Sequence, residues 1–166
     1  MIRPCTAEDF ATIGAIINDA ASAYKGVIPD DCYHEPYMPD DELAEEIARG
    51  VRFSGYEKDG RLAGVMGIEP VQDVTLIRHA YVRTNHRGGG IGGKLLKHLQ
   101  TATATPMLIG TWADADWAVR FYEARGFLRV SHDEKERLLR RYWTVGDRQI
   151  ETSVVLACER WRAKAS

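Results

Sequence analysis

Residues 85–96 of this chain read NHRGGGIGGKLL, and five of them are glycines. The stretch lies between an apolar run and an amphipathic run. Glycine in the first turns of a helix costs about 0.8–1 kcal/mol per residue relative to alanine, so Gly92 and Gly93 must serve a purpose there. Free N–H groups at a helix start point outward and carry partial positive charge, which suits a phosphate or pyrophosphate group. The stretch therefore predicts a phosphate-binding loop between a strand and a helix.

Three phosphate-binding patterns overlap on this loop. Residues 88–93 match the GxGxxG fingerprint of dinucleotide-binding proteins, with Asp114 at roughly the distance of the expected ribose-binding acid. Residues 88–94 match most of the GxxxxGK[ST] triphosphate loop, but Leu95 stands where a serine or threonine must hold magnesium. Residues 87–92 match a third pattern, RxxGxG. The surroundings of the loop must distinguish these patterns.

The composition is that of one globular domain spanning residues 1–166. The chain carries 22 basic and 24 acidic side chains, so no polyanion-binding field is indicated and we expect no nucleic-acid partner. Its three cysteines lie far apart without zinc-like spacing, which is typical of a reducing compartment and predicts no metal site. No apolar run approaches the ~18 residues of a membrane span. We therefore expect a cytoplasmic protein without membrane contact.

Hydrophobic periodicity predicts helices and strands that alternate around a sheet. An Asp59-Gly60 pair marks a hairpin between two apolar runs, so these strands are expected to be antiparallel. This weakens the dinucleotide pattern, which needs a βαβ unit, and no acid ends the strand at residues 106–111 to complete a triphosphate site. The predicted helices cover residues 6–23, 39–50, 91–103, 116–125 and 134–143. The predicted strands cover residues 51–56, 62–68, 74–82, 106–111, 127–130 and 150–157, with room for one more at residues 1–3.

Two blocks of sequence, in the correct order, resemble the signature of the GNAT superfamily of N-acetyltransferases. Tyr81-Val82 followed by the RxxGxG pattern is similar to the family's fourth strand, loop and third helix. Residues 118–127, which read AVRFYEARGF, resemble its later helix and turn. The resemblance implies a mixed α/β fold with a central, mostly antiparallel sheet of six to seven strands, flanked by about four or five helices. It covers residues 51–130 directly, and the order of elements extends it across nearly the whole chain.

The resemblance implies an acetyl-CoA-dependent N-acetyltransferase that acetylates a primary amine of a small molecule or peptide by direct attack in a ternary complex. Backbone N–H groups of the loop would hold the pyrophosphate. The strand before it would pair with the pantetheine arm and offer an N–H to the thioester oxygen, stabilising the oxyanion as it forms. Gly88 and Gly89 occupy variable positions of the RxxGxG pattern and Gly93 follows it, and all three are interpreted as permissive neighbours. The residues implied in cofactor binding are Tyr81, Val82, Arg87, Gly88, Gly89, Gly90, Ile91, Gly92 and Gly93.

Tyr122, in the second block, matches the tyrosine that protonates the departing thiolate in many GNAT enzymes. A phenol can do so through a short, oriented hydrogen bond. No motif fixes the base that takes the proton from the amine, and His79 and Glu69 are the two candidates. Strand alternation places His79 on the same side as Tyr81, where it serves as a base or as a core histidine. Arg78 is expected on the opposite face, where it could pair with a carboxylate of the acceptor or form a surface salt bridge.

The sequence departs from the family pattern at Ala115, where many members carry an asparagine, so Asp114 or Asp116 would have to supply its contacts. Eight acids between residues 30 and 46 would attract a cationic amine or form a solvated helix face. The basic aromatic segment at residues 137–148 is interpreted as an interface or lid. Three tyrosines before the second helix are candidates to line an acceptor pocket: Tyr24, Tyr33 and Tyr37.

An alternative function from another class is a non-catalytic acyl-CoA sensor module that uses the same pocket. Acetyl-CoA binding is common to both functions, whereas release of the thiol in the presence of an amine belongs to the enzyme alone. Dimers formed through the last strands are common in proteins of this kind, so a homodimer is an expectation by analogy.

Overall fold

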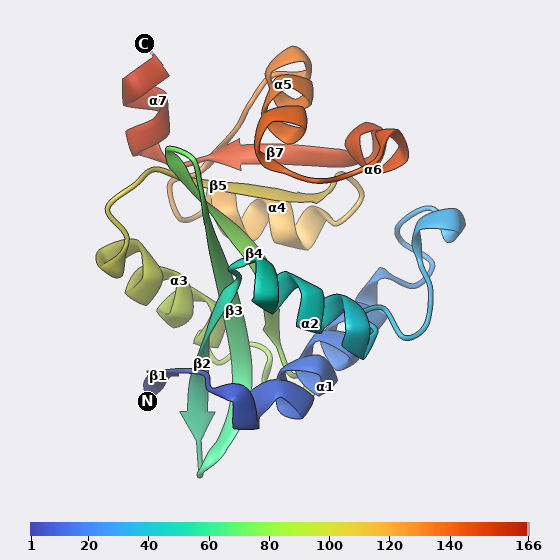
Figure 1. Ribbon diagram of the computed structural model, residues 1–166, viewed down its shortest axis with the longest axis vertical. Helices are drawn as coiled ribbons and strands as arrows, with labels where there is room; N and C mark the ends of the chain where they lie inside the picture. Colours follow the sequence, from blue (N-terminus) through green and yellow to red (C-terminus); the bar gives the residue numbers. More distant parts are fainter. Residues whose placement is uncertain (166) are drawn as a thin grey trace.

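The computed structural model describes residues 1–165 and contains a seven-stranded sheet with the order β1-β2-β3-β4-β5-β7-β6 (Figure 1). All neighbouring strands are antiparallel except β4 and β5, which are parallel. The sequence prediction of a mostly antiparallel sheet of six to seven strands is therefore confirmed. The strands are β1 (Ile2–Pro4), β2 (Arg52–Lys58), β3 (Arg61–Val71), β4 (Val74–Val82), β5 (Met107–Trp112), β6 (Leu128–Arg129) and β7 (Ser153–Ala157).

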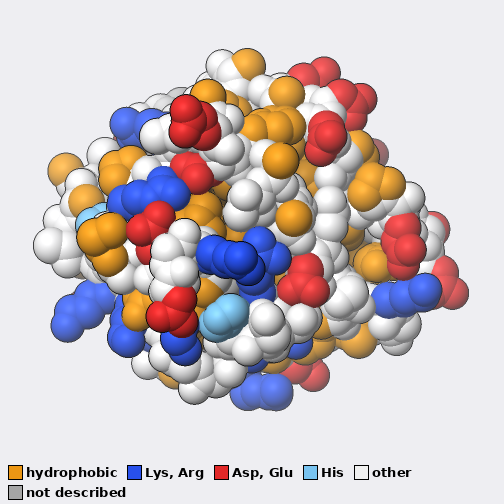
Figure 2. All heavy atoms as spheres, turned by 90° about the horizontal axis from the view of Figure 1, so that it is seen from below, with side chains coloured by type: hydrophobic (Ala, Val, Ile, Leu, Met, Phe, Trp, Pro, Cys, Tyr) orange, Lys and Arg blue, Asp and Glu red, His pale blue; other side chains and the backbone are white. Residues whose placement is uncertain are grey.

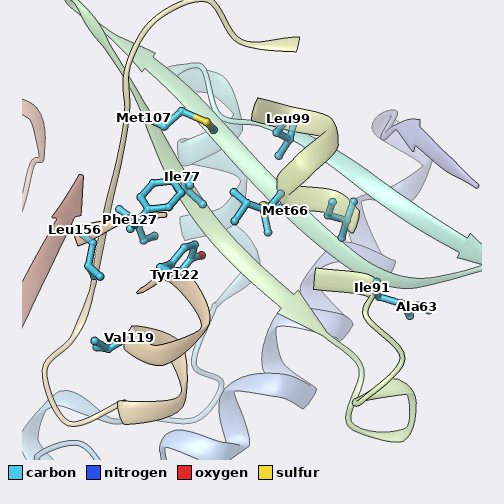
Figure 3. Packing of buried hydrophobic residues seen from close by; sticks show 13 residues of the cluster. Ala63, Met66, Ile77, Ile91, Leu99, Met107, Val119, Tyr122, Phe127 and Leu156 are labelled. Carbon is cyan, nitrogen blue, oxygen red and sulfur yellow. The ribbon is translucent and has the colours of Figure 1, made fainter. Parts of the chain in front are cut away.

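Helices cover both faces of this sheet (Figure 1). On one face α3 and α4 bury Leu99 and Val119 in one core with Met66 and Ile77 of the central strands (Figure 3). The opposite face is covered by α1 and α2 near β2 and β3, and by α5 and α6 near β5 and β7. The α-helices are α1 (Phe10–Ala21), α2 (Asp40–Arg49), α3 (Ile91–Ala102), α4 (Asp116–Glu123), α5 (His132–Tyr142), α6 (Asp147–Thr152) and α7 (Glu159–Ala165).

The predicted strand at residues 150–157 is only half correct. Residues up to Thr152 belong to α6, and β7 begins at Ser153. Ile150 is buried among the residues of α5 and β7, and the Thr152 hydroxyl donates to the Arg148 carbonyl one turn earlier. The alternating apolar residues from Ile150 onward predicted a strand, but the burial of Ile150 alone is equally compatible with a short helix. The terminal helix α7 was not predicted from the sequence.

A bulge interrupts β4 at His79, whose φ is +55°. Gly67 pairs with Arg78 and Val65 pairs with Tyr81, so the two residues between them on β4 oppose Met66 alone. A bulge of this kind breaks the strict alternation of side chains. As a result Arg78 and His79 both contact Glu46 on α2. The expectation that Arg78 and His79 lie on opposite sides was wrong, because it assumed an uninterrupted strand.

Beyond the bulge, β4 and β5 separate. Their register covers only three pairs, from Thr75 with Met107 to Ile77 with Ile109. The rest of β4 continues beside β3, and the rest of β5 continues beside β7. The sheet is therefore split in the middle, and a ligand can enter between its two halves.

Candidate active site

A cavity of about 740 Å³ fills the split between β4 and β5. Nearly all the residues implied by the sequence line this cavity, including His79 on the bulge and Tyr122 on α4. Gly89 and Glu69 are not among the lining residues. The cavity reaches from the glycine-rich loop beside α3 to the aromatic side chains beside α1 and α5. It therefore joins the two faces of the sheet.

The glycine-rich loop turns into α3 through two residues with positive φ. Gly88 has φ +81° and Gly90, which caps α3, has φ +76°. The N–H of Lys94 bonds to the Gly90 carbonyl and begins the helical ladder. The N–H groups of Ile91 and its next two neighbours therefore have no helical acceptor before them, and these three residues line the cavity. This backbone arrangement fits a pyrophosphate.

Gly92 and Gly93 allow α3 to approach α4 closely. A Cβ atom on Gly92 would lie 3.3 Å from the Phe121 ring, and one on Gly93 would lie 2.9 Å from the Arg125 guanidinium. That guanidinium lies 3.9 Å from the centroid of the Phe121 ring and donates to the Phe121 carbonyl. Arg125 is thereby held beside the loop, where it lines the cavity together with Arg87. Gly88 is favoured by its positive φ and is therefore more than a permissive neighbour, whereas a Cβ at Gly93 would require the Arg125 side chain to move.

Tyr122 is anchored in the core by its ring and faces the cavity with its hydroxyl. The side chain is 4% exposed and meets Phe121 and Phe127 edge to face. Figure 3 shows its hydroxyl oxygen directed away from Leu156. The hydroxyl is not sealed inside the protein, because the only enclosed side-chain polar atom without a partner in the described residues is Nε of Arg162. Burial raises the pKa of the Tyr122 phenol, which therefore keeps its proton at neutral pH.

His79 and Glu46 form a hydrogen-bonded pair at the cavity wall. Nε2 of His79 lies 2.6 Å from Oε2 of Glu46, and the Glu46 side chain is 7% exposed. Burial raises the pKa of the Glu46 carboxyl, but the hydrogen bond to His79 and the charges of Arg78 and Arg49 outweigh that effect and lower it. An ionised carboxylate can only accept a hydrogen bond, so Nε2 carries the proton and Nδ1 of the neutral ring is the acceptor.

Glu69, the other candidate base, belongs to the ion-pair network behind this pair. Its two oxygens accept from Arg78 at 2.9 Å and from Arg49 at 3.0 Å. Arg78 also donates to Glu46. Arg78 is therefore occupied by two carboxylates, and Glu69 stabilises the network without reaching the cavity.

Aromatic side chains form the wall of the cavity on the α1 side of the sheet. The rings of Tyr24 and Tyr37 lie 5.3 Å apart, and Trp117 stacks on Tyr24 at 5.9 Å. The Tyr24 and Tyr81 hydroxyls are 3.3 Å apart, and Nε1 of Trp112 donates to the Tyr37 hydroxyl at 2.8 Å. We call this set, completed by Trp143, the aromatic wall: Tyr24, Tyr37, Tyr81, Trp112, Trp117 and Trp143.

Several sequence expectations lie away from the cavity. No acidic side chain of the described residues lines it, so the acids at residues 30–46 do not reach an amine there. Ala115 is fully buried beside Tyr24, whereas Asp114 and Asp116 are exposed and do not take part in the lining. The basic aromatic segment does contribute, through Trp143, to the cavity wall.

Glu46, Trp112 and Trp117 were missed as functional residues by sequence reasoning, whereas Trp143 lay within the segment interpreted as an interface or lid. Glu46 looked like one of several acids on a solvated helix, although only this acid of α2 and Leu43 are buried in the helix. Its spacing of three residues from Leu43 places it on the inner face, and this signal could have identified it. The hydrogen bond between Glu46 and His79 depends on the bulge in β4, so the spacing of residues in the sequence could not predict it.

Membrane-spanning helices and metal-binding clusters are both absent from the described residues. None of the helices is long and apolar enough to cross a membrane, and no group of three or more His, Cys, Asp or Glu side chains is placed to hold a metal ion. Basic and acidic side chains are interspersed with apolar ones on the face seen in Figure 2. This face of the molecule therefore presents no extended surface of a single sign.

The chain can now be compared with known proteins. A family profile described as acetyltransferase (GNAT) domain matches residues 17–140. The chain therefore belongs to the GNAT acetyltransferase family. None of the curated proteins compared with it matches significantly.

Solved structures of acetyltransferases share the fold. PaiA N-acetyltransferase of Thermoplasma acidophilum, in complex with coenzyme A, is 17% identical with a TM-score of 0.70 over 95% of this chain and 97% of that chain. A GNAT family acetyltransferase of Staphylococcus aureus Mu50 is 13% identical with a TM-score of 0.69, over 96% and 99%. YncA of Salmonella typhimurium, solved with its cofactor acetyl-CoA, is 24% identical with a TM-score of 0.60, over 79% and 80%. These likenesses show the fold of the chain.

Proposed function

We propose that this protein is an N-acetyltransferase that moves an acetyl group from acetyl-CoA to a primary amine by direct attack in a ternary complex. One observation carries the proposal. A single cavity joins a pyrophosphate-type loop on one face of the sheet to a carboxylate-held histidine on the other, and a tyrosine hydroxyl faces it. Two substrates can therefore meet between β4 and β5.

The loop and the split strand fit coenzyme A. The free N–H groups at the start of α3 and the guanidinium groups of Arg87 and Arg125 suit the phosphates. The N–H of Arg83 donates to the carbonyl of Ala63 on β3. In an antiparallel ladder neighbouring residues alternate between pairing with one side and with the other. The N–H and C=O of Val82 therefore face away from β3, toward the split. This unpaired backbone can bond the amide groups of a pantetheine arm. Acetyl-CoA supplies the activated acetyl group and a thiolate leaving group.

His79 is the proposed general base. An amine attacks only after it has lost a proton, and Nδ1 of His79 can accept that proton because Glu46 holds the proton on Nε2. The same carboxylate stabilises the imidazolium that forms. Glu46 is thus a positioning residue, and the network of Arg78 and Glu69 fixes it in turn.

Tyr122 is the proposed general acid. Its phenol keeps its proton in the buried environment, and its hydroxyl is directed into the cavity, where it can protonate the departing sulfur. The core contacts of its ring hold the hydroxyl in place.

A Tyr122→Phe variant tests the proposal. Release of the coenzyme thiol in the presence of a good amine should fall by about 10²-fold in kcat, because general acid catalysis contributes at least that much. Binding of coenzyme A, measured by calorimetry, should remain. Tyr142→Phe is a matched control, since its hydroxyl bonds to Asp73 outside the cavity. Unchanged kcat in Tyr122→Phe would exclude the acid role. Tight binding of acetyl-CoA without thiol release for any amine would favour the sensor function instead.

A further inference from the structure

The aromatic wall defines the class of amine that this cavity accepts. We propose that the acceptor is a small monoamine with a flat, uncharged, aromatic or apolar body, without a carboxylate and without a second cationic group. The proposal rests on the acetyl-transfer function proposed above. It is argued from the shape, polarity and charge of the wall around His79.

The wall offers ring surfaces and few free polar groups. The hydroxyls of Tyr24 and Tyr81 face each other at 3.3 Å, and the Tyr37 hydroxyl accepts from Nε1 of Trp112. Each of these hydroxyls has at least one protein partner, and each tyrosine presents mainly its ring to the cavity. Trp143 adds a ring that lies against Gly110 of β5, where a Cβ would be 3.4 Å from Cζ2 of the indole. Flat apolar surfaces pack on such rings, and aromatic pairs gain binding free energy beyond that of the area they bury.

The charges around the cavity exclude two common kinds of amine. No acidic side chain of the described residues lines the cavity, so a second ammonium group of a polyamine or amino sugar would lose its hydration without gaining a counter-ion. Arg78, the cation beside His79, is occupied by Glu46 and Glu69. Arg87 and Arg125 line the cavity from the glycine-rich loop and from α4, beside the proposed phosphate site. The carboxylate of a free amino acid therefore has no available partner near His79.

An ion pair joins two of the chain segments that contribute to the wall. Asp31 lies between Tyr24 and Tyr37 in the loop after α1, and Arg148 lies on α6, just after Trp143. Arg148 donates to both oxygens of Asp31, at 2.8 Å and 3.1 Å. The loop after α1 and α6 face each other in Figure 1. This ion pair holds the loop that carries Tyr24 and Tyr37 close to the segment that carries Trp143.

The experiment compares matched amines at saturating acetyl-CoA by release of the coenzyme thiol. 2-Phenylethylamine carries one amine and one ring. Phenylalanine adds a carboxylate to the same body, and 1,4-diaminobutane replaces the ring by a second cation. We expect kcat/KM for 2-phenylethylamine to exceed both others by about tenfold or more, because burial of an unpaired charged group costs more than 1.4 kcal/mol. Equal or better use of either of the others would overturn the proposal while leaving acetyl transfer intact.

Variants of the aromatic wall provide a second test of the proposed acceptor class. Trp143→Ala should raise KM for 2-phenylethylamine by about threefold to tenfold with a smaller effect on kcat, and Trp143→Phe should restore most of the loss because it keeps a ring. Trp161→Phe, outside the cavity, is the control and should behave as the wild type. An unchanged KM in Trp143→Ala would also contradict the proposal.

A binding measurement separates the two proposals. If no amine releases thiol, acetyl transfer fails as a function. The melting temperature of the coenzyme A-saturated protein still reports the ligand class: 2-phenylethylamine should raise it and 1,4-diaminobutane should not. A larger shift with the diamine, or none with 2-phenylethylamine, would overturn the proposed acceptor class.

Discussion

Glu46 illustrates how one buried carboxylate can determine the chemistry of a neighbouring ring. It accepts from Nε2 of His79 and from Arg78, and it is 5% exposed. Without these cationic and donor partners a buried carboxylate would be costly, and without the carboxylate the histidine would be free to hold its proton on the other nitrogen. The pair therefore specifies the tautomer of His79 that can accept a proton from an amine.

Three substitutions test this arrangement. His79→Gln should lower kcat/KM by about 10²-fold or more, since it removes the base. Glu46→Gln should lower kcat/KM by about tenfold and change its pH dependence, because an amide can donate as well as accept and no longer fixes the tautomer. Glu69→Gln is the matched control: it loses an ion pair with the same Arg78 but does not touch His79. An equal kinetic effect of Glu69→Gln would show that the network is merely structural.

Asp9 links the first strand to the first helix. Its ion pair should make the free energy of unfolding depend on pH in the acidic range. Hydrogen bonds from Arg3, followed by the backbone N–H of Thr6, lower the pKa of Asp9 from 3.8 to about 2. Because the folded-state pKa is lowered, this stabilisation is complete well above the unfolded-state pKa of 3.8 and is lost as the pH falls through that value toward 2. Asp9→Asn should cost about 1 kcal/mol at pH 7, given the partial exposure of the pair.

Urea unfolding at several pH values measures this effect. The difference in unfolding free energy between wild type and Asp9→Asn should be constant from pH 7 to pH 5 and should shrink between pH 4 and pH 2. Asp114→Asn, at an exposed position, serves as the control and should show no such difference. A gap that persists unchanged at the lowest pH would contradict the assigned ion pair.

At the scale of elements, the junction of the loop with α3 depends on glycines that adopt positive φ. Gly90 caps the helix at φ +76°, a conformation that costs a residue with a Cβ about 1–2 kcal/mol. Gly90→Ala should therefore lower the free energy of unfolding by about 1 kcal/mol and weaken coenzyme A binding, because the N–H groups behind it lose their direction. Calorimetry and thermal unfolding measure both effects.

Gly146→Ala is the matched control for Gly90→Ala. Gly146 caps α6 at φ −80°, and an added Cβ meets nothing within 4 Å. Alanine there should change stability by less than about 1 kcal/mol, in either direction, and leave coenzyme A binding unchanged. If both variants lost the same stability and coenzyme A affinity, the positive φ of Gly90 would not be what stabilises the loop.

Part of the fold and part of the candidate site could be predicted from the sequence. The glycine-rich loop, the hairpin at Asp59-Gly60 and the long amphipathic helices follow local rules, and the structure contains them. The short helix α6 did not follow, because six residues are too few to display a helical period. The bulge at His79 depends on pairing with Met66 on another strand, which no local pattern encodes. The loop was therefore predictable, and the His79–Glu46 pair was not.

At the scale of the whole molecule, the sheet consists of two halves with a limited connection. Strands β1 to β4 form one half and β5, β7 and β6 the other, and the register between them covers three residue pairs. The helices α3 and α4 pack together across this junction, with Tyr122 and Leu95 in one core. A ligand that fills the cavity between β4 and β5 contacts residues of both halves, so its binding free energy adds to their cohesion.

Coenzyme A should therefore stabilise the folded protein as a unit. At a free concentration of 100 times its Kd, a ligand that binds only the folded state adds about 2.7 kcal/mol to the free energy of unfolding. The melting temperature should rise with coenzyme A concentration, and amide hydrogen exchange should slow in β4, in β5 and at the start of α3 together. NAD is the control. Contrary to the sequence expectation, β4, α3 and β5 form a parallel βαβ unit, but only three residue pairs join its two strands and all other neighbouring strands are antiparallel, unlike the mostly parallel sheet of a dinucleotide-binding fold. A larger shift with NAD than with coenzyme A, or protection confined to one half of the sheet, would contradict binding in the split.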